Sequence, residues 1–178
     1  MNTKVFIVST KEKNNMSYAI VYSSKTGNTE LLASTIKDTL PHGECIYFGN
    51  PNPAALKADT IYLGFWTDKG NCNKETSEFL NMLTNKKVFL FGTAGFGEDE
   101  SYFDKILERV SEQMSKDITL IGSYMCQGRM PMAVRTRYEK MKDSPNAMPH
   151  LDQMIENFDK ALSHPDAQDL ANLKSSLK

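Results

Sequence analysis

The chain has 178 residues, of which 40% are hydrophobic and 24% are charged, with 21 Lys plus Arg against 22 Asp plus Glu. This length suits one domain with enough apolar residues to bury a core, which excludes general disorder. The net charge of −1 gives no electrostatic reason to expect a nucleic-acid partner. Apolar runs reach only about six residues, whereas a bilayer-spanning helix needs ~20, so no membrane partner is expected.

The cysteines and the N-terminus indicate the compartment. Cys45, Cys72 and Cys126 form no C-x-x-C motif, and no histidine accompanies them at metal-ligand spacing. An odd number of cysteines without such spacing argues against a disulfide framework and against a zinc site, and we expect no metal. The N-terminal residues show no signal-peptide pattern. We therefore expect a reducing, cytoplasmic location.

Short apolar runs alternate with amphipathic segments along most of the chain. The runs predict strands at 18–23, 44–49, 60–65, 87–93 and 118–125. The amphipathic segments predict helices at 28–40, 74–83, 101–114 and 151–162. This alternation favours an α/β fold with a parallel sheet, which binds its ligands in loops beyond the carboxyl ends of the strands.

The two ends lie outside this regular pattern. Residues 16–162 hold the predicted domain, and residues 1–15 form an N-terminal extension in which 5–8 is a possible edge strand. Residues 163–178 form a C-terminal tail with a further helix, which we expect to pack on the domain surface.

A long basic link joins the fifth strand to the helix at 151–162. Pro131 can open a helix that runs to Lys142. Within this link, residues 129–142 carry five cations against the single acid Glu139, namely Arg129, Arg135, Arg137, Lys140 and Lys142. The segment is either a solvated helix face, a docking surface for an acidic partner, or a loop over a bound ligand.

The loop after the first strand has the composition of an anion site. It reads Ser24-Lys25-Thr26-Gly27-Asn28-Thr29 and leads directly into a helix. A helix N-terminus offers free N–H groups and partial positive charge, to which the loop adds hydroxyl donors, and Gly27 lets the backbone curl. The spacing of a nucleoside triphosphatase or a dinucleotide site is absent. A monoester phosphate fits such a cradle, and simple helix capping is the alternative.

This loop resembles the FMN phosphate loop of the flavodoxin family, whose pattern is S/T-x-T-G-x-T. The resemblance covers residues 17–162. It implies a flavodoxin-like three-layer sandwich with a five-stranded parallel sheet in the order 2-1-3-4-5 and helices on both faces. It also implies FMN as the cofactor, held at the phosphate by residues 24–29.

The loop after the third strand contains the only tryptophan, Trp66. In flavodoxins this loop stacks an aromatic side chain on the flavin, and one of its glycine peptides can turn toward the flavin N5. The resemblance therefore assigns Phe65, Trp66, Thr67 and Gly70 to the cofactor, with Trp66 stacking and Gly70 as the turning peptide. Packing of Trp66 on the core at the sheet edge is the alternative.

Three glycines crowd the loop after the fourth strand. Its residues Thr93, Ala94, Gly95, Phe96 and Gly97 follow an apolar run, which indicates close approach of the backbone to another group. In flavodoxins this loop borders the flavin and usually offers a tyrosine. Here the second stacking residue is either Phe96 or Tyr102, and Cys126, beyond the fifth strand, can lie near the flavin edge. A plain glycine turn is the alternative.

Two functions of different kinds fit these features. The first is an FMN-bound electron carrier, because His42, His150 and His164 lie away from the three loops and no catalytic residue is evident. The second is an NAD(P)H-dependent flavin or quinone reductase of the same fold. Segments 126–132 and 164–170 resemble a flavodoxin subgroup associated with gut bacterial bilirubin reductase, which implies that reductase as the redox partner. We expect a monomer.

Overall fold

The computed structural model describes residues 16–97, 100–145 and 148–177. Its centre is a parallel sheet in the order β2-β1-β3-β5-β6. The parallel strands are β1 (Tyr18–Tyr22), β2 (Cys45–Gly49), β3 (Thr60–Asp68), β5 (Lys87–Ala94) and β6 (Thr119–Gln127). Counted along the chain, this order is 2-1-3-4-5, which confirms the predicted fold class. The short strand β4 (Asn71–Cys72) pairs antiparallel with the end of β3.

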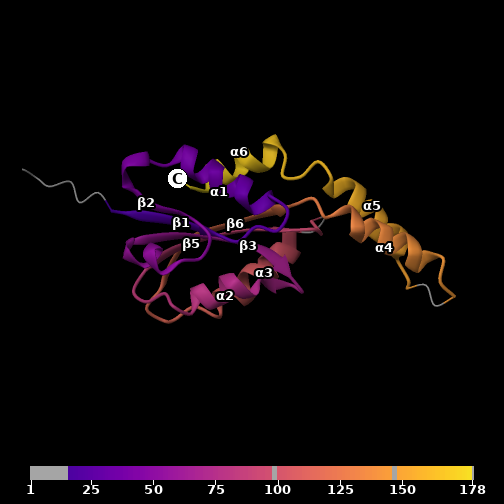
Figure 1. Ribbon diagram of the computed structural model, residues 1–178, viewed down its shortest axis with the longest axis horizontal. Coiled ribbons are helices and arrows are strands. Elements are labelled where there is room, and N and C mark those ends of the chain that lie inside the picture. Colours follow the sequence, from indigo (N-terminus) through magenta and orange to yellow (C-terminus); the bar gives the residue numbers. More distant parts are fainter. Residues whose placement is uncertain (1–15, 98–99, 146–147, 178) are drawn as a thin grey trace, which may run out of the picture.

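Helices cover both faces of this sheet (Figure 1). On one face lie α1 (Asn28–Thr39) and α6 (Ala167–Ser176); on the other lie α2 (Lys74–Leu80) and α3 (Glu100–Ser111). Two short 3-10 helices, η1 (His42–Glu44) and η2 (Pro53–Lys57), flank β2. None of the helices in the described part of the chain is long and apolar enough to cross a membrane.

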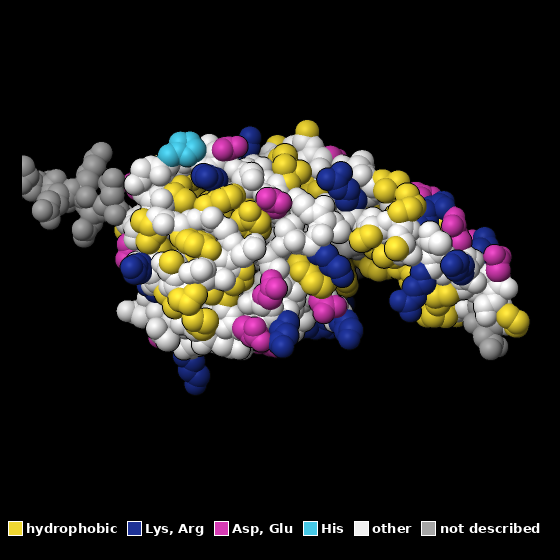
Figure 2. Space-filling model, in the orientation of Figure 1, with side chains coloured by type: hydrophobic (Ala, Val, Ile, Leu, Met, Phe, Trp, Pro, Cys, Tyr) yellow, Lys and Arg dark blue, Asp and Glu magenta, His cyan; other side chains and the backbone are white. Residues whose placement is uncertain are grey.

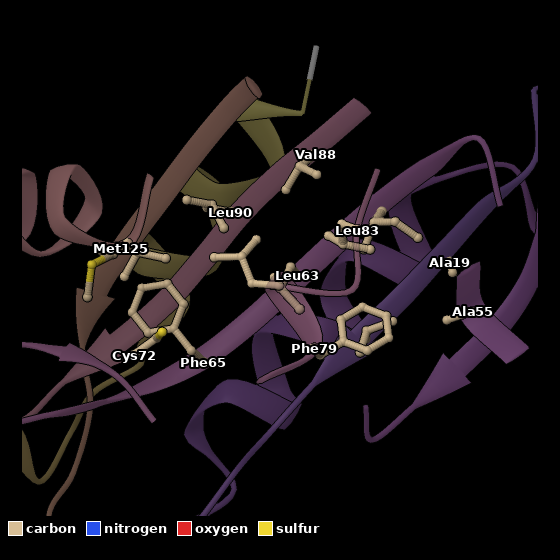
Figure 3. Packing of buried hydrophobic residues seen from close by; sticks show 14 of the residues in the cluster. Ala19, Ala55, Leu63, Phe65, Cys72, Phe79, Leu83, Val88, Leu90 and Met125 are labelled. Atoms are coloured by element: carbon tan, nitrogen blue, oxygen red, sulfur yellow. The ribbon is translucent and has the colours of Figure 1, made fainter. Parts of the chain in front are cut away.

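Strand alternation divides the core into two halves. In β1, Ala19 and Val21 point into the layer beneath α2 and α3, whereas Ile20 points toward α1 and α6. Period-two alternation produces this division, because successive side chains of a strand leave opposite faces. Figure 3 shows the first layer, in which Phe65 and Leu63 of β3 pack among neighbouring strand residues. Both layers lie below the loops at the carboxyl ends of the strands, and they hold those loops in place.

The helix at 151–162 does not cover the sheet. It forms α5 (Leu151–Ala161), which packs against α4 (Met132–Lys142) as an arm that projects beyond the sheet (Figure 1). The tail helix α6 instead lies beside α1 and contacts β6. Its Leu173 is fully buried in the core, with Leu170 and Leu177 packed around it. The second helix on the α1 face of the sheet therefore comes from the C-terminal tail.

Two strands run further than predicted. β3 continues through Trp66 to Asp68 and turns into β4, so the segment expected as a loop is a hairpin. Its turn residues Lys69 and Gly70 have φ angles of 51° and 77°, the two positive values that a type I′ turn requires. β6 continues to Gln127, which places Cys126 inside a strand, buried on the α1 and α6 side. The expectation that Cys126 lies beyond the fifth strand is therefore wrong. The possible strand at 5–8 lies outside the described residues.

Candidate functional site

A pocket of about 370 Å³ opens at the carboxyl ends of β1, β3 and β5. This is the edge of the sheet at which parallel α/β folds bind ligands. From the three predicted loops it is lined by Lys25, Thr26, Asn28, Trp66, Thr67, Gly70, Thr93, Ala94, Gly95 and Phe96. It is also lined by Lys69, Tyr102, Gly128, Arg129, Met130, Pro131 and Val134. The fold therefore brings all three predicted loops to one cavity.

The first loop presents unused backbone donors at the start of α1. Gly27 precedes the helix with φ of 86°, a left-handed conformation that residues with a Cβ rarely adopt. The Ser24 hydroxyl accepts from the N–H groups of Gly27 and Glu30, at 3.1 and 3.3 Å. Within the described residues, the N–H groups of Lys25, Thr26, Asn28 and Thr29 have no acceptor. These groups and the helix dipole form a cradle for an anion.

Ser24, Gly27 and Thr29 shape this loop without lining the pocket. Thr29 is fully buried, and its hydroxyl lies 3.3 Å from the Phe65 carbonyl oxygen and 3.2 Å from the Thr93 hydroxyl. The Thr29 side chain therefore fastens α1 to β3 and β5. The sequence reasoning had expected its hydroxyl to be a phosphate donor.

Asn28 ties the first loop to a distant segment. Its Nδ2 donates to the Thr26 hydroxyl at 2.9 Å and to the Arg129 carbonyl at 2.8 Å, so both of its hydrogens are used. Gly128 fits tightly here, because a Cβ at that position would lie 2.5 Å from Asn28 Nδ2. The Asn28 Oδ1 atom is buried without a partner among the described residues. One face of the pocket therefore depends on a contact between residues 101 positions apart.

Trp66 is half-exposed on the pocket wall and does not belong to either core cluster. It sits within β3, opposite Thr93 of β5, and the Lys25 Nζ atom lies 5.0 Å from its ring centroid. Core packing, the alternative weighed for this side chain, is thus not what the structure shows. Phe65 points the other way, into the core, because adjacent strand residues leave opposite faces. The Phe65 side chain therefore does not line the pocket.

The hairpin tip is held from below by α3. The Arg109 guanidinium donates from Nη1 to the Gly70 carbonyl at 3.0 Å. Just past the end of α3, Gln113 donates to the Asn71 side chain at 2.8 Å. Gly70 therefore lines the pocket while its carbonyl oxygen already accepts a hydrogen bond from Arg109.

The glycine loop after β5 forms the remaining wall. Phe96 is exposed at the pocket mouth, and Tyr102 is half-buried beside it, so both aromatic candidates lie at the site. Burial raises the pKa of the Tyr102 phenol and keeps it protonated. The Gly95 carbonyl accepts from Gln127 and from Asn157 of α5, each at 3.0 Å. Gly97, which was predicted as a cofactor residue, packs against Gln127 and does not line this pocket.

Sequence reasoning missed the wall formed by residues 128–134. Gly128 donates its N–H to the Ala94 carbonyl at 2.9 Å, and the Met130 side chain lies against Gly95. A loop over the ligand was one of the alternatives for this basic link. The sequence predicts a helix that starts at Pro131. Nothing in the local sequence indicates that the start of this helix lies against the pocket.

The charged side chains found in the described pocket lining are all positive. Its described lining contains the cations Lys25, Lys69 and Arg129, and no Asp, Glu, His or Cys. The Thr67 hydroxyl, like Asn28 Oδ1, is buried without a partner in the described structure. Buried polar groups in proteins are nearly always hydrogen-bonded, so these two atoms indicate a site completed by a ligand.

A model of the flavodoxin domain family matches residues 19–178. The chain belongs to the flavodoxin family. This member is similar to the flavodoxin-like domain-containing protein BilS of Clostridium symbiosum (strain WAL-14163), with 39% identity over 175 residues, which cover 88% of this chain and 91% of that protein. A second BilS, from Clostridioides difficile (strain CD3), is 33% identical over 162 residues, which cover 87% and 90%.

Solved structures support the same architecture. The flavodoxin-family WrbA-like protein from Agrobacterium tumefaciens superposes with a TM-score of 0.51 at 14% identity, covering 90% of this flavodoxin chain and 99% of that one. At this identity the similarity shows the fold.

A group of potential metal ligands lies at the start of α6. Oxygen or nitrogen atoms of His164, Asp166 and Asp169 lie within 4.8 Å of one another. Their hydrogen bonds are those of a helix cap: Asp166 accepts from the amides of Gln168 and Asp169, while Asp169 accepts from the Asp166 amide and contacts His164. Helix capping accounts for this cluster.

Proposed function

We propose that the protein binds FMN in this pocket and carries electrons to a partner reductase. The observation that carries the proposal is the set of unused N–H groups around Gly27, at the N-terminus of α1. Such a cradle suits a phosphate monoester, and membership of the flavodoxin family supports FMN as its source. A single anion loop and a cavity of about 370 Å³ favour FMN over FAD.

The residues of the pocket fit the cofactor. Lys25 and Thr26 would hold the phosphate, Trp66 would stack on the isoalloxazine, and Phe96 or Tyr102 would cover its other side. The unpartnered Asn28 Oδ1 and Thr67 hydroxyl would meet polar atoms of the ligand. Bound FMN would supply one- and two-electron redox chemistry, while these residues position it and exclude water.

The composition of the pocket favours a carrier over a reductase that binds its own nicotinamide. No acid or base is found among the described lining residues other than Tyr102 and the cations. The burial that keeps Tyr102 protonated makes it a poor proton shuttle at neutral pH. The chain's own residues therefore serve to bind and orient the cofactor.

A bilirubin reductase, which reduces bilirubin to urobilinogen, is the partner we propose. The support is the relationship to the two BilS proteins and the subgroup resemblance of segments 126–132 and 164–170. These segments touch, because Arg129 donates its N–H to the His164 carbonyl at 3.0 Å. They meet directly behind the pocket, so the features that characterise the subgroup lie beside the cofactor site.

Three measurements on the purified protein test this function. We expect flavin absorption bands, FMN in the mass spectrum of the released cofactor, and no steady oxidation of NADH or NADPH. We also expect the photoreduced protein to pass electrons to a bilirubin reductase. Release of FAD, or rapid NAD(P)H oxidation by the protein alone, would overturn the FMN assignment or the carrier role respectively.

A further inference from the structure

The basic residues on the two sides of α4 differ in whether they form ion pairs. On the side facing α5, Arg135 donates from Nε to Asp159 at 2.9 Å and also pairs with Glu139, while Lys142 pairs with Asp152. These ion pairs fix the arm internally and neutralise its basic residues there. Arg137 and Lys140 lie about a third to half a turn away, on the side that α5 does not cover.

That uncovered side is a groove. It has a volume of about 650 Å³ and is lined by Ala133, Thr136, Arg137, Lys140, Met141 and Ser144. These positions follow the i, i+3, i+4 spacing of one helix face. No residue of α4 is buried, and neither Arg137 nor Lys140 forms an ion pair with a described residue. Figure 2 shows Lys and Arg side chains on the arm beside the hollow that separates it from the body.

The first turn of α4 lies at the pocket, so the outer face of this helix starts beside it. Pro131 and Val134, at the start of α4, line the pocket, and Arg137 follows Val134 by one helical turn. Lys25, Lys69 and Arg129 line the pocket itself, where no described carboxylate faces them. Positive side chains therefore extend from the cofactor mouth along the outer side of α4, although the whole chain has a net charge of −1.

We propose that Arg137 and Lys140, together with Lys69 and Arg129 at the pocket, form the docking surface for the redox partner, and that the partner's matching surface is acidic. The proposal rests on the carrier function proposed above. Complementary charge speeds encounter and sets the orientation in which two redox centres approach. Here it would bring an acidic patch of the partner against α4 with the open edge of the cofactor beside it.

Small charged oxidants test the field at this surface. The photoreduced holoprotein is mixed in a stopped-flow instrument with ferricyanide, a trivalent anion, or with hexaammineruthenium(III), a trivalent cation. In Arg137→Glu/Lys140→Glu we expect the rate with ferricyanide at low salt to fall by about three- to tenfold, and the rate with the cation to rise. Added salt should reduce both effects.

The matched control reverses the same amount of charge elsewhere. Lys57→Glu/Lys116→Glu changes two exposed lysines at the amino-terminal edge of the sheet, opposite the pocket. This control should leave both rates within about 1.5-fold of the parent, because the two lysines lie at the opposite edge of the sheet and the attraction between charges falls with distance. Equal responses of the two double variants, or no response of either, would overturn the proposed surface.

A cross-linking experiment with a bilirubin reductase tests the docking itself. A carbodiimide that joins amines to carboxylates should link Lys140 to an acidic residue of the reductase. Lys140→Arg keeps the charge and removes the amine, so the link should disappear while the electron-transfer rate is retained. Electron transfer without a Lys140 link would contradict the docking surface. Absence of any transfer to the reductase would count against the proposed partner, and the charged oxidants would still decide the location of the surface.

Discussion

At the scale of single residues, the site depends on one backbone conformation and one aromatic ring. Gly27 adopts a left-handed conformation at the start of α1, among backbone amides that have no acceptor in the described structure. Trp66 leaves β3 on the pocket side, whereas Phe65, its neighbour, leaves it on the core side. The two ends of a flavin mononucleotide therefore make separate demands on the chain, and each can be tested alone.

The phosphate end is tested by Gly27→Val. A Cβ at Gly27 meets no atom within 4 Å, so the damage comes from the φ of 86°, which a β-branched residue strongly disfavours. We expect FMN affinity to fall at least about tenfold in a fluorescence titration, because the amide cradle opens. Gly43→Val is the matched control, since its Cβ is also unobstructed and its φ is not positive. Similar losses in both variants would argue against the cradle.

The ring end is tested by Trp66→Ala. Loss of stacking and of apolar burial should weaken FMN binding by roughly 1–3 kcal/mol. The reduction potential of the couple that forms the anionic hydroquinone should rise, because a wetter site penalises the negative charge of that form less. Trp66→Phe keeps a flat ring and should show smaller changes. Potentiometry that finds the same potential in Trp66→Ala and the parent would leave stacking to Phe96 or Tyr102.

At the scale of elements, the pocket is held by contacts between segments that are distant in sequence. α3 holds the β3–β4 hairpin through Arg109, and Asn28 of α1 holds the segment after β6. The arm is attached at the glycine loop through Asn157. Each of these walls is thus fixed by a contact with an element that is distant in the sequence.

Arg109→Ala tests the contact between α3 and the hairpin. The Gly70 carbonyl loses its donor, and the pocket loses a nearby positive charge that favours the added electrons. We expect a more negative reduction potential, measured by potentiometry, with FMN still bound. Arg109→Lys retains the charge, so it should recover most of the shift. A potential that stays the same or rises in Arg109→Ala would show that the charge does not act on the flavin.

Leu173→Ala tests whether α6 completes the sheet. Leu173 is fully buried between α6 and the sheet, so its truncation should reduce the free energy of unfolding by about 2–5 kcal/mol. Leu162→Ala makes the same chemical change at a site in the arm that is 46% exposed, and it should cost no more than about 0.5 kcal/mol. Denaturant unfolding of both variants measures the difference. Equal costs would mean that α6 packs only loosely.

At the scale of the whole molecule, the proposed binding of FMN would be linked to folding. The loops that line the pocket come from the ends of β1, β3, β5 and β6, so they assemble only when the sheet is complete. A ligand that binds only this assembled state stabilises the entire domain.

Thermal unfolding with added flavin measures that linkage. FMN at a hundred times its Kd should add about 2.7 kcal/mol, which corresponds to a rise in Tm of roughly 5–11 °C for a chain of this size. Riboflavin, which lacks the phosphate, should stabilise less at the same concentration, because the amides around Gly27 stay unused. At the same FMN concentration, a tenfold weaker affinity should limit the stabilisation of Gly27→Val to about 1.4 kcal/mol, roughly half of that in the parent. Equal stabilisation by FMN and riboflavin would show that the phosphate does not bind at the assigned loop.

The sequence by itself determined the features that arise from local patterns. Alternation of apolar runs with amphipathic helices specified the parallel sheet, since each pattern reflects burial within one element, and the order of its strands was implied by the resemblance to flavodoxins. The Ser24–Thr29 loop was identifiable because its donors and its glycine are adjacent in the chain. Trp66 and the glycine loop followed, because parallel strands bring their carboxyl ends to one edge.

Only the tertiary structure decided which segments meet. Asn28 bonds to Arg129, 101 positions away, so the wall at 128–134 cannot be inferred from either segment alone. The amphipathic pattern of 151–162 is satisfied equally by a sheet or by another helix, and α4 supplied the second. α6 then took the place on the sheet, because Leu173 can be buried there. Local patterns state how much apolar surface an element must bury, but the partner that buries it is chosen by the packing of the whole chain.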